Sequence, residues 1–401
     1  MKKTIALVLA VVMCLALAAC GGSGASTTGK SDAPAVKVGF IFLHDENSTY
    51  DKNFMDAAVQ ACEKLGVEYL LKTNIPEDEH CAEAAEELID EGCNIVFADS
   101  FGHESFMIEV AKNHPDVQFC HATGTRAHTE NLANYHNAFA SIYEGRYLAG
   151  VAAGLKLKEM IDDGKITVEQ AKMGYIGAYT YAEVISGYTS FFLGAKSIVP
   201  EVTMEVTFTG SWYDFDLEQT GAKALIDDGC VLISQHADSM GAPGACETAG
   251  VPNVSYNGST IDACPNTFIV SSRINWEPYF EYIIGCVRDG KAIDTDWTGT
   301  IDTQSVVLTD VNEAVAAEGT AAIIESVKAQ LLAGERHVFD TATFTVGGEM
   351  LDEYMADVDT DEAYTPDTNV IADGYFHESE FRSAPYFDLR IDGITLLDEK
   401  Y

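Results

Sequence analysis

The stretch VKVGFIFL, Val36–Leu43, decides the fold because it is an almost continuous apolar run rich in branched and aromatic side chains. A run of this kind is typical of a strand that is buried on both faces of a sheet. The apolar residues of Phe54–Leu65 then recur at helical spacing, which predicts a helix after the strand. A strand followed by a helix is the repeating unit of a parallel α/β sheet.

The same alternation continues and then restarts, which predicts two lobes. Further strands are expected at Glu68–Leu71, Asn94–Ala98 and Val117–Cys120, and a second series at Met173–Ile176, Thr203–Phe208, Val231–Ser234 and Val251–Tyr256. The expected fold class is therefore α/β, with each lobe a parallel sheet flanked by helices. Because ligands of open α/β sheets bind beyond the carboxyl ends of the strands, the binding cleft is expected between the lobes.

The chain is expected to cross between the lobes more than once. We assign residues 36–140 and about 265–305 to lobe 1, and residues 141–264 and about 306–345 to lobe 2. A long helix is expected at Val311–Leu332. Residues 346–401 are rich in Asp and Tyr without a clear period, and we interpret them as a C-terminal wrap.

The N-terminal residues predict export and a lipid anchor. Two lysines precede an apolar run of about 13 residues, which is shorter than the roughly 20 needed for a membrane-spanning helix. The sequence Leu17-Ala18-Ala19-Cys20 resembles the lipobox of bacterial lipoproteins, so residues 1–19 are expected to be a signal peptide and residues 20–35 a lipidated cysteine with a flexible tether. The expected location is the extracytoplasmic face of the cell membrane, held by lipid on Cys20. An ordinary secretory signal ending near a cysteine is the alternative.

The charge balance excludes one class of partner. The chain has 24 Lys and Arg against 63 Asp and Glu, for a net charge of −39. Such a surface repels nucleic-acid phosphates and anionic lipid headgroups, so no nucleic-acid partner is expected, and the lipid anchor is the expected membrane contact. Eight cysteines lie beyond the signal and anchor, and both disulfides and buried free thiols remain open for them.

Two motifs suggest cofactors without the context that such sites need. Residues 24–31, GASTTGKS, match the phosphate-loop pattern but lie in the tether instead of between a strand and a helix. The acidic run Asp357–Asp361 begins like a calcium loop, but its sixth position is Glu362 and its twelfth is Thr368, where such a loop needs Gly and Glu. No cofactor, no metal site and no catalytic constellation are therefore predicted.

The informative residues follow the predicted strands. In the second lobe, Trp212, the pair His236 and Asp238, and Asn257 follow three successive strands. In the first lobe, Asp45 and Tyr50 follow the first strand, with Phe54 in the helix after it, and Trp276 and Arg273 belong to the returning segment.

For a planar heteroaromatic ligand this chemistry is coherent, because an aromatic side chain stacks on the ring while amide and carboxyl groups bind its edge. Simpler structural roles remain open for the same residues. Trp212 is also suited to core packing, Asp238 to capping a helix, and His236 to a structural hydrogen bond.

Several stretches resemble the basic membrane protein family of ABC-transporter lipoproteins, which includes the purine nucleoside receptor lipoprotein. The resemblance is carried by Tyr50–Phe54 (YDKNF), Tyr143–Gly150 (YEGRYLAG), Gly210–Trp212 (GSW), Gln235–Ser239 (QHADS) and Asn275–Tyr279 (NWEPY), and the last two are similar to the adenine-type branch. It implies a two-lobed type I periplasmic-binding-protein fold and an ABC permease as partner.

The resemblance also implies roles for individual residues. Phe54 and Trp212 match the aromatic positions that stack on the base. Met55 stands where an Asn is expected, Asn257 where an Asp is expected, and Arg273 approximately where a Lys is expected, and the last two positions hold ribose in the nucleoside-binding members. The departures favour a free base.

The resulting hypothesis is a non-enzymatic solute-binding lipoprotein that captures a purine base, adenine first. Trp212 and Phe54 would stack on the ring, Asp238 and Asn257 would bind its edge, and His236 and Trp276 would line the pocket. The alternatives are a nucleoside- or sugar-binding lipoprotein of the same fold, a lipid-anchored nucleosidase using Asp45 and Asp51, and a receptor without a transport partner.

Overall fold

The computed structural model describes residues 35–358 and 368–399. The predicted signal peptide, the lipidation site Cys20 and the tether up to residue 34 lie outside the described residues. The phosphate-loop match at residues 24–31 and the carboxylates Asp359 and Asp361 of the acidic run lie outside them as well.

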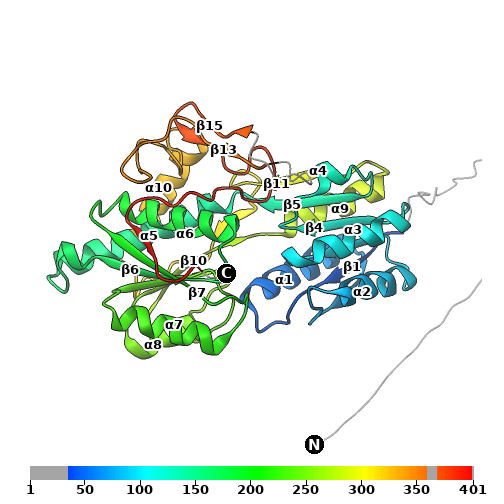
Figure 1. The fold of residues 1–401 in the computed structure, drawn as a ribbon. Coiled ribbons are helices and arrows are strands. Elements are labelled where there is room, and N and C mark those ends of the chain that lie inside the picture. Colours follow the sequence, from blue (N-terminus) through cyan, green and yellow to red (C-terminus); the bar gives the residue numbers. More distant parts are fainter. Residues whose placement is uncertain (1–34, 359–367, 400–401) are drawn as a thin grey trace, which may run out of the picture. The chain divides into compact units, whose positions relative to one another are not determined.

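The described residues alternate strands and helices through most of their length (Figure 1). The helices are α1 Thr49–Leu65, α2 Glu79–Asp90, α3 Glu104–Asn113, α4 Ala127–Glu130, α5 Ile142–Asp162, α6 Ala182–Lys196, α7 Phe215–Asp227, α8 Gly241–Ala249, α9 Glu277–Asp289 and α10 Thr320–Leu332, with short 3₁₀ turns at Phe101–His103 and Val168–Gln170. The strands of the two large sheets are β1 Lys37–Ile41, β2 Glu68–Lys72, β3 Ile95–Ala98, β4 Gln118–Ala122, β5 Tyr135–Ala140, β6 Lys172–Gly177, β7 Thr203–Phe208, β8 Leu232–Gln235, β9 Asn253–Tyr256, β10 Phe268–Ile274, β11 Asp296–Gly299, β12 Val306–Leu308 and β17 Ile394–Leu396. Two small hairpins pair β13 Met355–Ala356 with β14 Thr368–Asn369, and β15 Ile371–Ala372 with β16 Tyr375–Phe376.

Two parallel sheets form the framework, as the alternating pattern predicted. The first sheet has the order β11-β5-β4-β3-β1-β2, and all its pairs are parallel. The second has the order β12-β10-β9-β8-β6-β7-β17 and is parallel except for β12, which pairs antiparallel with β10. In the second sheet, α5 and α6 cover one face while α7 and α8 cover the other (Figure 1). The two-lobed α/β prediction is confirmed.

The chain passes between the two sheets three times: from β5 through α5 to β6, from β10 through α9 to β11, and from β11 to β12. The stretch 265–305, expected in lobe 1, is divided between the sheets. Its strand β10 pairs with β9 in the second sheet, because Phe268–Ile274 is an apolar strand that fits beside β9, while β11 pairs with β5 in the first.

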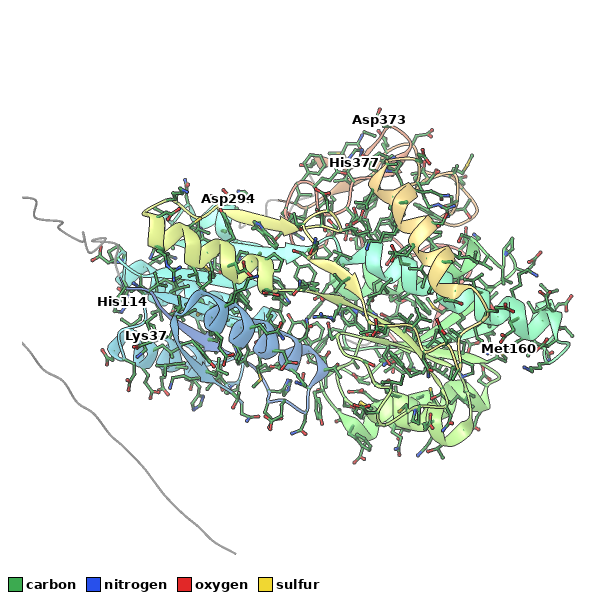
Figure 2. The ribbon with its side chains drawn as sticks, turned by 180° about the vertical axis from the view of Figure 1, so that it is seen from behind. Lys37, His114, Met160, Asp294, Asp373 and His377 are labelled. Carbon is green, nitrogen blue, oxygen red and sulfur yellow. The ribbon has the colours of Figure 1, made fainter. Side chains whose placement is uncertain are left out.

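The C-terminal residues are more than a wrap. Strand β17 adds to the edge of the second sheet by pairing in parallel with β7, from Ile394 opposite Met204. Phe387 of this segment stacks on Phe339, which follows α10, with ring centroids 4.2 Å apart. Figure 2 labels Asp373 and His377 of this segment, which lies beside α10. Within the described residues, all eight cysteines are free thiols, and all are buried, so they act as small apolar side chains.

Candidate ligand-binding site

A cavity of about 350 Å³ lies between the carboxyl ends of the two sheets. One side is formed by the loops after β1, β3 and β4 of the first sheet and by the first turn of α1. The other side is formed by the loops after β7 and β8 and by the first turn of α6. We refer to it as the cleft cavity, and its lining residues are Leu43, His44, Tyr50, Asp51, Ser100, Phe101, Thr123, Glu183, Trp212, His236 and Asp238.

The first wall is built on the N-terminus of α1. Ser48 caps this helix by accepting the backbone N–H of Asp51, and its hydroxyl donates back to Asp51 Oδ2 at 2.5 Å. His44 adds its backbone N–H to Asp51 Oδ1 at 2.7 Å, and its ring Nδ1 lies 3.3 Å from Oδ2. Burial alone would raise the pKa of Asp51, but the hydrogen bonds from His44 and Ser48 hold that pKa below its ordinary value. Asp51 is therefore a fixed carboxylate that orients His44 toward the cavity.

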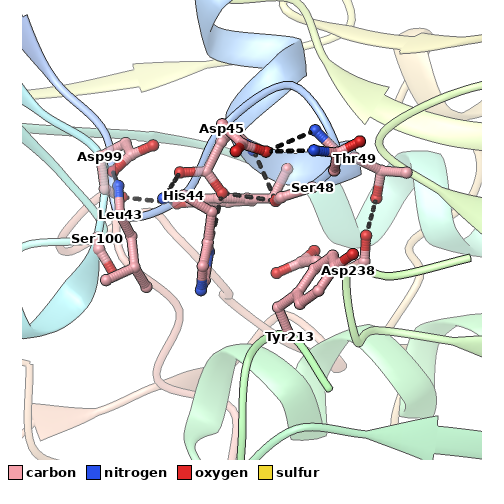
Figure 3. Close-up of polar contacts among 12 residues, drawn as sticks. Leu43, His44, Asp45, Ser48, Thr49, Asp99, Ser100, Tyr213 and Asp238 are labelled. Carbon is pink, nitrogen blue, oxygen red and sulfur yellow. Dashed lines mark hydrogen bonds and ion pairs between the residues drawn. The ribbon is translucent and has the colours of Figure 1, made fainter. Parts of the chain in front are cut away.

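Asp99 lies beneath this wall, at the end of β3. It is fully buried, and its Oδ1 accepts the backbone N–H of Leu43 at 3.2 Å, while its Oδ2 has no hydrogen-bond partner among the described residues. Figure 3 shows Asp99 beside Leu43 and Ser100. Burial, with Asp51 nearby, raises the pKa of Asp99 well above its ordinary value, which favours the protonated form of the side chain.

Aromatic rings form the opposite wall. Trp212 follows β7, and Tyr179 meets it edge to face with ring centroids 5.0 Å apart. Tyr179 in turn stacks on Tyr181 at 5.0 Å, and Tyr181 lies 5.3 Å from Phe101 of the first lobe. The two lobes therefore meet through aromatic rings at the rim of the cleft cavity, while the indole of Trp212 lines its interior.

His236 is fixed in the second wall by two neighbours. Arg146 of α5, itself buried, has its Nη2 3.0 Å from His236 Nδ1, and Glu183 Oε1 lies 3.4 Å from Nε2. A guanidinium can only donate, so Nδ1 accepts and the imidazole proton is on Nε2, facing Glu183. Burial lowers the pKa of His236, which keeps the ring neutral. Arg146 also lies over the ring of Tyr256, 3.2 Å from its centroid.

Asp238 joins the two lobes through its backbone and faces the cavity with its side chain. Its carbonyl oxygen accepts the backbone N–H of Thr49 at 3.0 Å and the Thr49 hydroxyl at 3.1 Å (Figure 3). Asn257 Nδ2 donates to Asp238 Oδ1 at 3.4 Å. Burial raises the pKa of Asp238 well above its ordinary value, and the nearby carboxylates Asp51, Glu218 and Glu183 add to that increase. A neutral carboxyl group offers one donor and one acceptor on the same edge.

Four of the nine sequence-predicted site residues line the cleft cavity: Tyr50, Trp212, His236 and Asp238. Asn257 lies behind Asp238 with φ of +64°, a conformation that Asn tolerates better than most residues. Asp45 stands outside the lining and accepts from Asn47 at 2.7 Å.

Three predicted site residues lie elsewhere. Phe54 and Trp276 are buried in the core of the first lobe, stacked on each other with ring centroids 4.4 Å apart, and neither lines the cavity. Both were expected against the ligand, but α1 turns Phe54 toward the sheet instead of toward the cleft. Arg273 donates to Asn53 Oδ1 at 3.0 Å and so ties β10 to α1.

Sequence reasoning missed several of the residues that build the site. Ser100 and Phe101 follow β3, and Thr123 follows β4, so the rule that strand ends face the cleft could have found them. Glu183 and Arg146 lie on helices, and no local sequence signal pointed to them.

The arrangement suits reversible binding of a flat polar molecule. It combines an indole, a phenol ring, carboxyl groups and an imidazole in one cavity. Within residues 35–358 and 368–399, no group of three His, Cys, Asp or Glu side chains is placed to hold a metal ion. The helices described there include none with the length and apolar character to span a membrane.

Comparison with known proteins points to transport. The family model described as "ABC transporter substrate-binding protein PnrA-like" matches residues 38–334. The chain is 34% identical over 260 residues to a purine-binding protein of Brucella abortus, which covers 64% of this chain and 69% of that protein. It is 24% identical over 264 residues to an ABC transporter nucleoside-binding protein of Lactococcus lactis, covering 64% of this chain and 71% of that protein.

A further relative carries a different ligand in its name. The chain is 32% identical over 207 residues to a putative ABC transporter glucose-binding protein of Haloferax volcanii, covering 51% of this chain and 49% of that protein. This chain therefore spans about half the length of that relative.

Solved structures share the fold. A solute-binding protein of an ABC transporter from Conexibacter woesei superimposes with a TM-score of 0.58 at 20% identity, over 76% of this chain and 98% of that one. A second, from Aeropyrum pernix, gives 0.64 at 16% identity, over 75% and 92% of the two chains.

Proposed function

The chain belongs to the Bmp family of PnrA-like ABC transporter substrate-binding proteins, and from this premise we propose that it captures a purine base, adenine first, for an ABC permease. The proposal includes a lipid anchor on Cys20 and a location on the extracytoplasmic face of the membrane. It involves binding and release without a chemical step. The names of the Brucella and Lactococcus relatives support a purine or nucleoside as the ligand class.

The observation that carries the proposal is the meeting of Trp212 and Asp238 in one cavity. An indole face stacks well on a nucleobase, a contact that is usually worth about 1–3 kcal/mol. Burial favours the protonated form of Asp238, and in that form the carboxyl group offers a donor and an acceptor side by side. Adenine presents the complementary pair, a ring nitrogen that accepts and an amino group that donates. An ionised carboxylate would suit the two adjacent donors of guanine instead.

A nucleosidase is less well supported by the carboxylates named for it. Asp51 is occupied by His44 and Ser48, and Asp45 by Asn47, so neither carboxylate is free to act on a substrate in the cleft cavity. A general acid or base must reach the proton that it moves. Incubation with adenosine is therefore expected to give no free base.

Isothermal titration with adenine, guanine, adenosine, ribose and glucose tests the ligand class. We expect adenine to bind at micromolar concentration or tighter, and ribose and glucose to give no heat. Tight binding of glucose or ribose alone would end the purine proposal and favour the sugar-binding alternative named by the Haloferax relative.

Replacing Trp212 tests the stacking. The Trp212→Ala variant is expected to bind adenine about tenfold more weakly or worse, because it loses the ring contact. Phe215→Ala is the matched control, since Phe215 is an exposed aromatic residue at the start of α7, three positions after Trp212, and does not line the cleft cavity. An unchanged affinity for Trp212→Ala would show that the indole is not the platform.

Two substitutions of Asp238 test the edge contact. Asn keeps one donor and one acceptor at fixed charge, so Asp238→Asn is expected to retain adenine binding within a few-fold, whereas Asp238→Ala is expected to weaken it by about tenfold or more. If Asp238→Asn instead abolished binding and guanine bound the parent chain better than adenine, the carboxyl would be acting in its ionised form.

A further inference from the structure

The last described residues of the chain form a segment that contacts both lobes. Residues 377–399, which we call the strap, lie beyond the family match, which ends at residue 334. In Figure 1 the strap is the red trace that runs from beside β11 of the first sheet to β17 at the edge of the second sheet. It is separate from the three crossings that join the sheets, so it adds a further connection between the lobes.

The end of the strap at the second lobe is firmly held. Strand β17 pairs in parallel with β7, and the backbone N–H of Leu397 donates to the carbonyl oxygen of Val206 at 2.8 Å. Before this strand, Phe387 is fully buried and stacks on Phe339. Breaking these contacts would remove a strand from the sheet and expose apolar surface to water, which costs free energy. This end of the strap therefore moves with the second lobe.

The end of the strap at the first lobe is held by hydrogen bonds to side chains of β11. The backbone N–H of Ser383 donates to Asp296 Oδ2 at 2.8 Å, and the Thr298 hydroxyl donates to the carbonyl oxygen of Ser379 at 3.5 Å. The second of these distances is long for a hydrogen bond between two oxygens. Because both bonds use side chains of β11, they can form and break while the sheet stays intact.

Several buried polar atoms at this contact have no hydrogen-bond partner among the described residues. They are Ser379 Oγ, Arg382 Nη1, Ser383 Oγ and Asp296 Oδ1. A polar group that is buried without a partner costs free energy, and it regains partners when it is exposed to water. Separation of the strap from β11 therefore recovers part of the free energy that is lost with the hydrogen bonds of Ser383 and Thr298.

The strap also borders the space beside the cleft cavity. Ala384 and Pro385 line a neighbouring cavity, which shares Phe101, Thr123 and Glu183 with the cleft cavity. Phe101 and Thr123 belong to the first lobe and Glu183 to the second, so the strap lies across the gap between the lobes at this point. A movement of the lobes therefore changes the surroundings of the strap.

The lobes are closed in the structure. The backbone N–H of Thr49 in the first lobe donates to the carbonyl oxygen of Asp238 in the second at 3.0 Å. Asp296 begins β11, and a crossing to the second sheet follows the end of that strand at Gly299. Rotation of the lobes about the crossing displaces Asp296 from the strap, because the strap stays with the second lobe.

We propose that the strap is a latch, which stays attached to the second lobe and engages β11 only when the lobes are closed. Engagement stabilises the closed form through the hydrogen bonds of Ser383 and Ser379, and it thereby slows opening and the release of a ligand. The inference comes from the contacts of the strap and applies to any ligand that closes the lobes. The arms of its test that use adenine rest on the proposed function.

Hydrogen–deuterium exchange at single amides of the full chain tests the latch directly. The amide of Ser383 reports the end at β11 and that of Leu397 the end at β7, so the strap carries its own control. Without ligand, we expect the Ser383 amide to exchange about tenfold faster or more than the Leu397 amide, relative to their intrinsic rates. Saturating adenine is expected to slow exchange at Ser383 by about tenfold or more and to leave Leu397 unchanged. Equally slow exchange at both amides without ligand would show that the strap is permanently attached to both lobes.

A variant that releases the latch tests its effect on the ligand. Asp296→Ala removes the acceptor for Ser383, so adenine is expected to dissociate from it about tenfold faster than from the parent chain in a stopped-flow experiment. Asp302→Ala is the matched control, since Asp302 is an exposed aspartate in the turn after β11, and it is expected to release adenine at the parent rate. Exchange at Leu397 that matches the parent chain reports that the second lobe of each variant is folded.

A third variant separates the latch from the other neighbour of Asp296. His128 Nε2 lies 3.5 Å from Asp296 Oδ2, so Asp296→Ala removes that contact as well. His128→Gln is expected to release adenine at the parent rate, because the acceptor for Ser383 remains. Faster release from His128→Gln that equals the release from Asp296→Ala would assign the effect to the histidine and contradict the latch.

The outcomes separate the two proposals. If adenine binds, but Ser383 exchanges as it does without ligand and Asp296→Ala releases adenine at the parent rate, the latch proposal is wrong and the base proposal stands. If adenine fails to bind, the proposed function is wrong. The latch is then decided by the ligand-free chain, in which equally slow exchange at Ser383 and Leu397 would overturn it.

Discussion

Among the described residues of the C-terminal segment, Glu378 is the most strongly buried acidic side chain. It is 1% exposed, and neither of its carboxyl oxygens has a hydrogen-bond partner among the described residues. Burial raises its pKa from the ordinary value to about 8. The folded chain therefore holds a proton there at pH values where the unfolded chain has released it, so the contribution of Glu378 to the free energy of unfolding falls as pH rises between about 4.5 and 8.

Replacing Glu378 by Gln should remove this pH dependence. Gln has nearly the shape of a protonated Glu, so Glu378→Gln is expected to match the parent chain near pH 4.5 and to exceed its stability by roughly 2–4 kcal/mol at pH 8.5. Urea unfolding at the two pH values measures the difference.

The exposed Glu353 of the same segment provides the control, since Glu353→Gln makes the same chemical change outside the core. We expect its stability to follow that of the parent chain at both pH values. An advantage of Glu378→Gln that is equal at pH 4.5 and 8.5 would show that the proton is not the cause.

The site residues show what a single sequence reveals at this scale. Trp212, His236 and Asp238 were found because they directly follow strands, and the carboxyl ends of parallel strands meet at one edge. Phe54 and Trp276 also lie near strand ends, but each is a large apolar side chain with an equal use in the core. A small rotation of a helix about its axis decides whether such a side chain points into the core or into the cleft. The sequence does not specify that rotation.

Helices α5 and α6 pack closely against each other at two glycines, Gly150 and Gly194. A side chain at Gly150 would meet the backbone carbonyl of Phe191, and one at Gly194 would meet the carbonyl of Tyr147. The close approach lets the two helices bury a long shared face over the second sheet.

A methyl group at this crossing should separate the helices. Gly194→Ala is expected to lower the free energy of unfolding by about 1–3 kcal/mol, because the obstructing atoms belong to the backbone and cannot rotate away. Urea unfolding monitored by circular dichroism measures the loss.

Gly244 in α8 is the matched position, since a side chain there has no atom within 4 Å. Gly244→Ala is expected to raise stability by about 0.5–1 kcal/mol through helix propensity alone. A loss at Gly244 comparable to that at Gly194 would contradict the packing explanation.

Some elements could not be predicted because their patterns are concealed. Helix α5 is buried over much of its surface. It therefore has no polar face, and its sequence does not show the helical period of polar residues by which a surface helix is recognised. Strand β5 contains His136 and Asn137 although every residue in it is buried. Helix α10 starts at Thr320 instead of Val311, directly after Gly319 with φ of +81°, a conformation that interrupts a right-handed helix.

The net charge of −39 acts on the molecule as a whole. Like charges spread over one surface repel one another, and the repulsion is greater in the compact state than in the extended chain. Raising NaCl from about 20 mM to about 500 mM at pH 7 is expected to raise the melting temperature by about 2–5 °C, because salt screens this repulsion.

The same salt series near pH 4.3 is the control, because the chain carries little net charge at that pH. There we expect added NaCl to change the melting temperature by less than it does at pH 7. An equal rise at both pH values would point to a general salt effect on burial of apolar surface instead of screening.

The architecture as a whole was the most predictable level. Two runs of alternating strands and helices were enough to predict two parallel sheets with a cleft between them. Only a few arrangements of strands and helices bury the apolar faces that this pattern creates. The returning segment was harder, because β10 and β11 are consecutive along the chain and yet join different sheets.

Strand β17 has a consequence for how the chain acquires its structure during synthesis. Its partner β7 pairs through Met204 with Ile394, and 190 positions separate the two residues. A nascent chain that has grown past residue 310 already contains six of the seven strands of the second sheet, but the outer edge of β7 is still open to other polypeptides. Closing so long a loop is slow, so the edge of β7 stays exposed to mispairing with other polypeptides until the last residues have been synthesised.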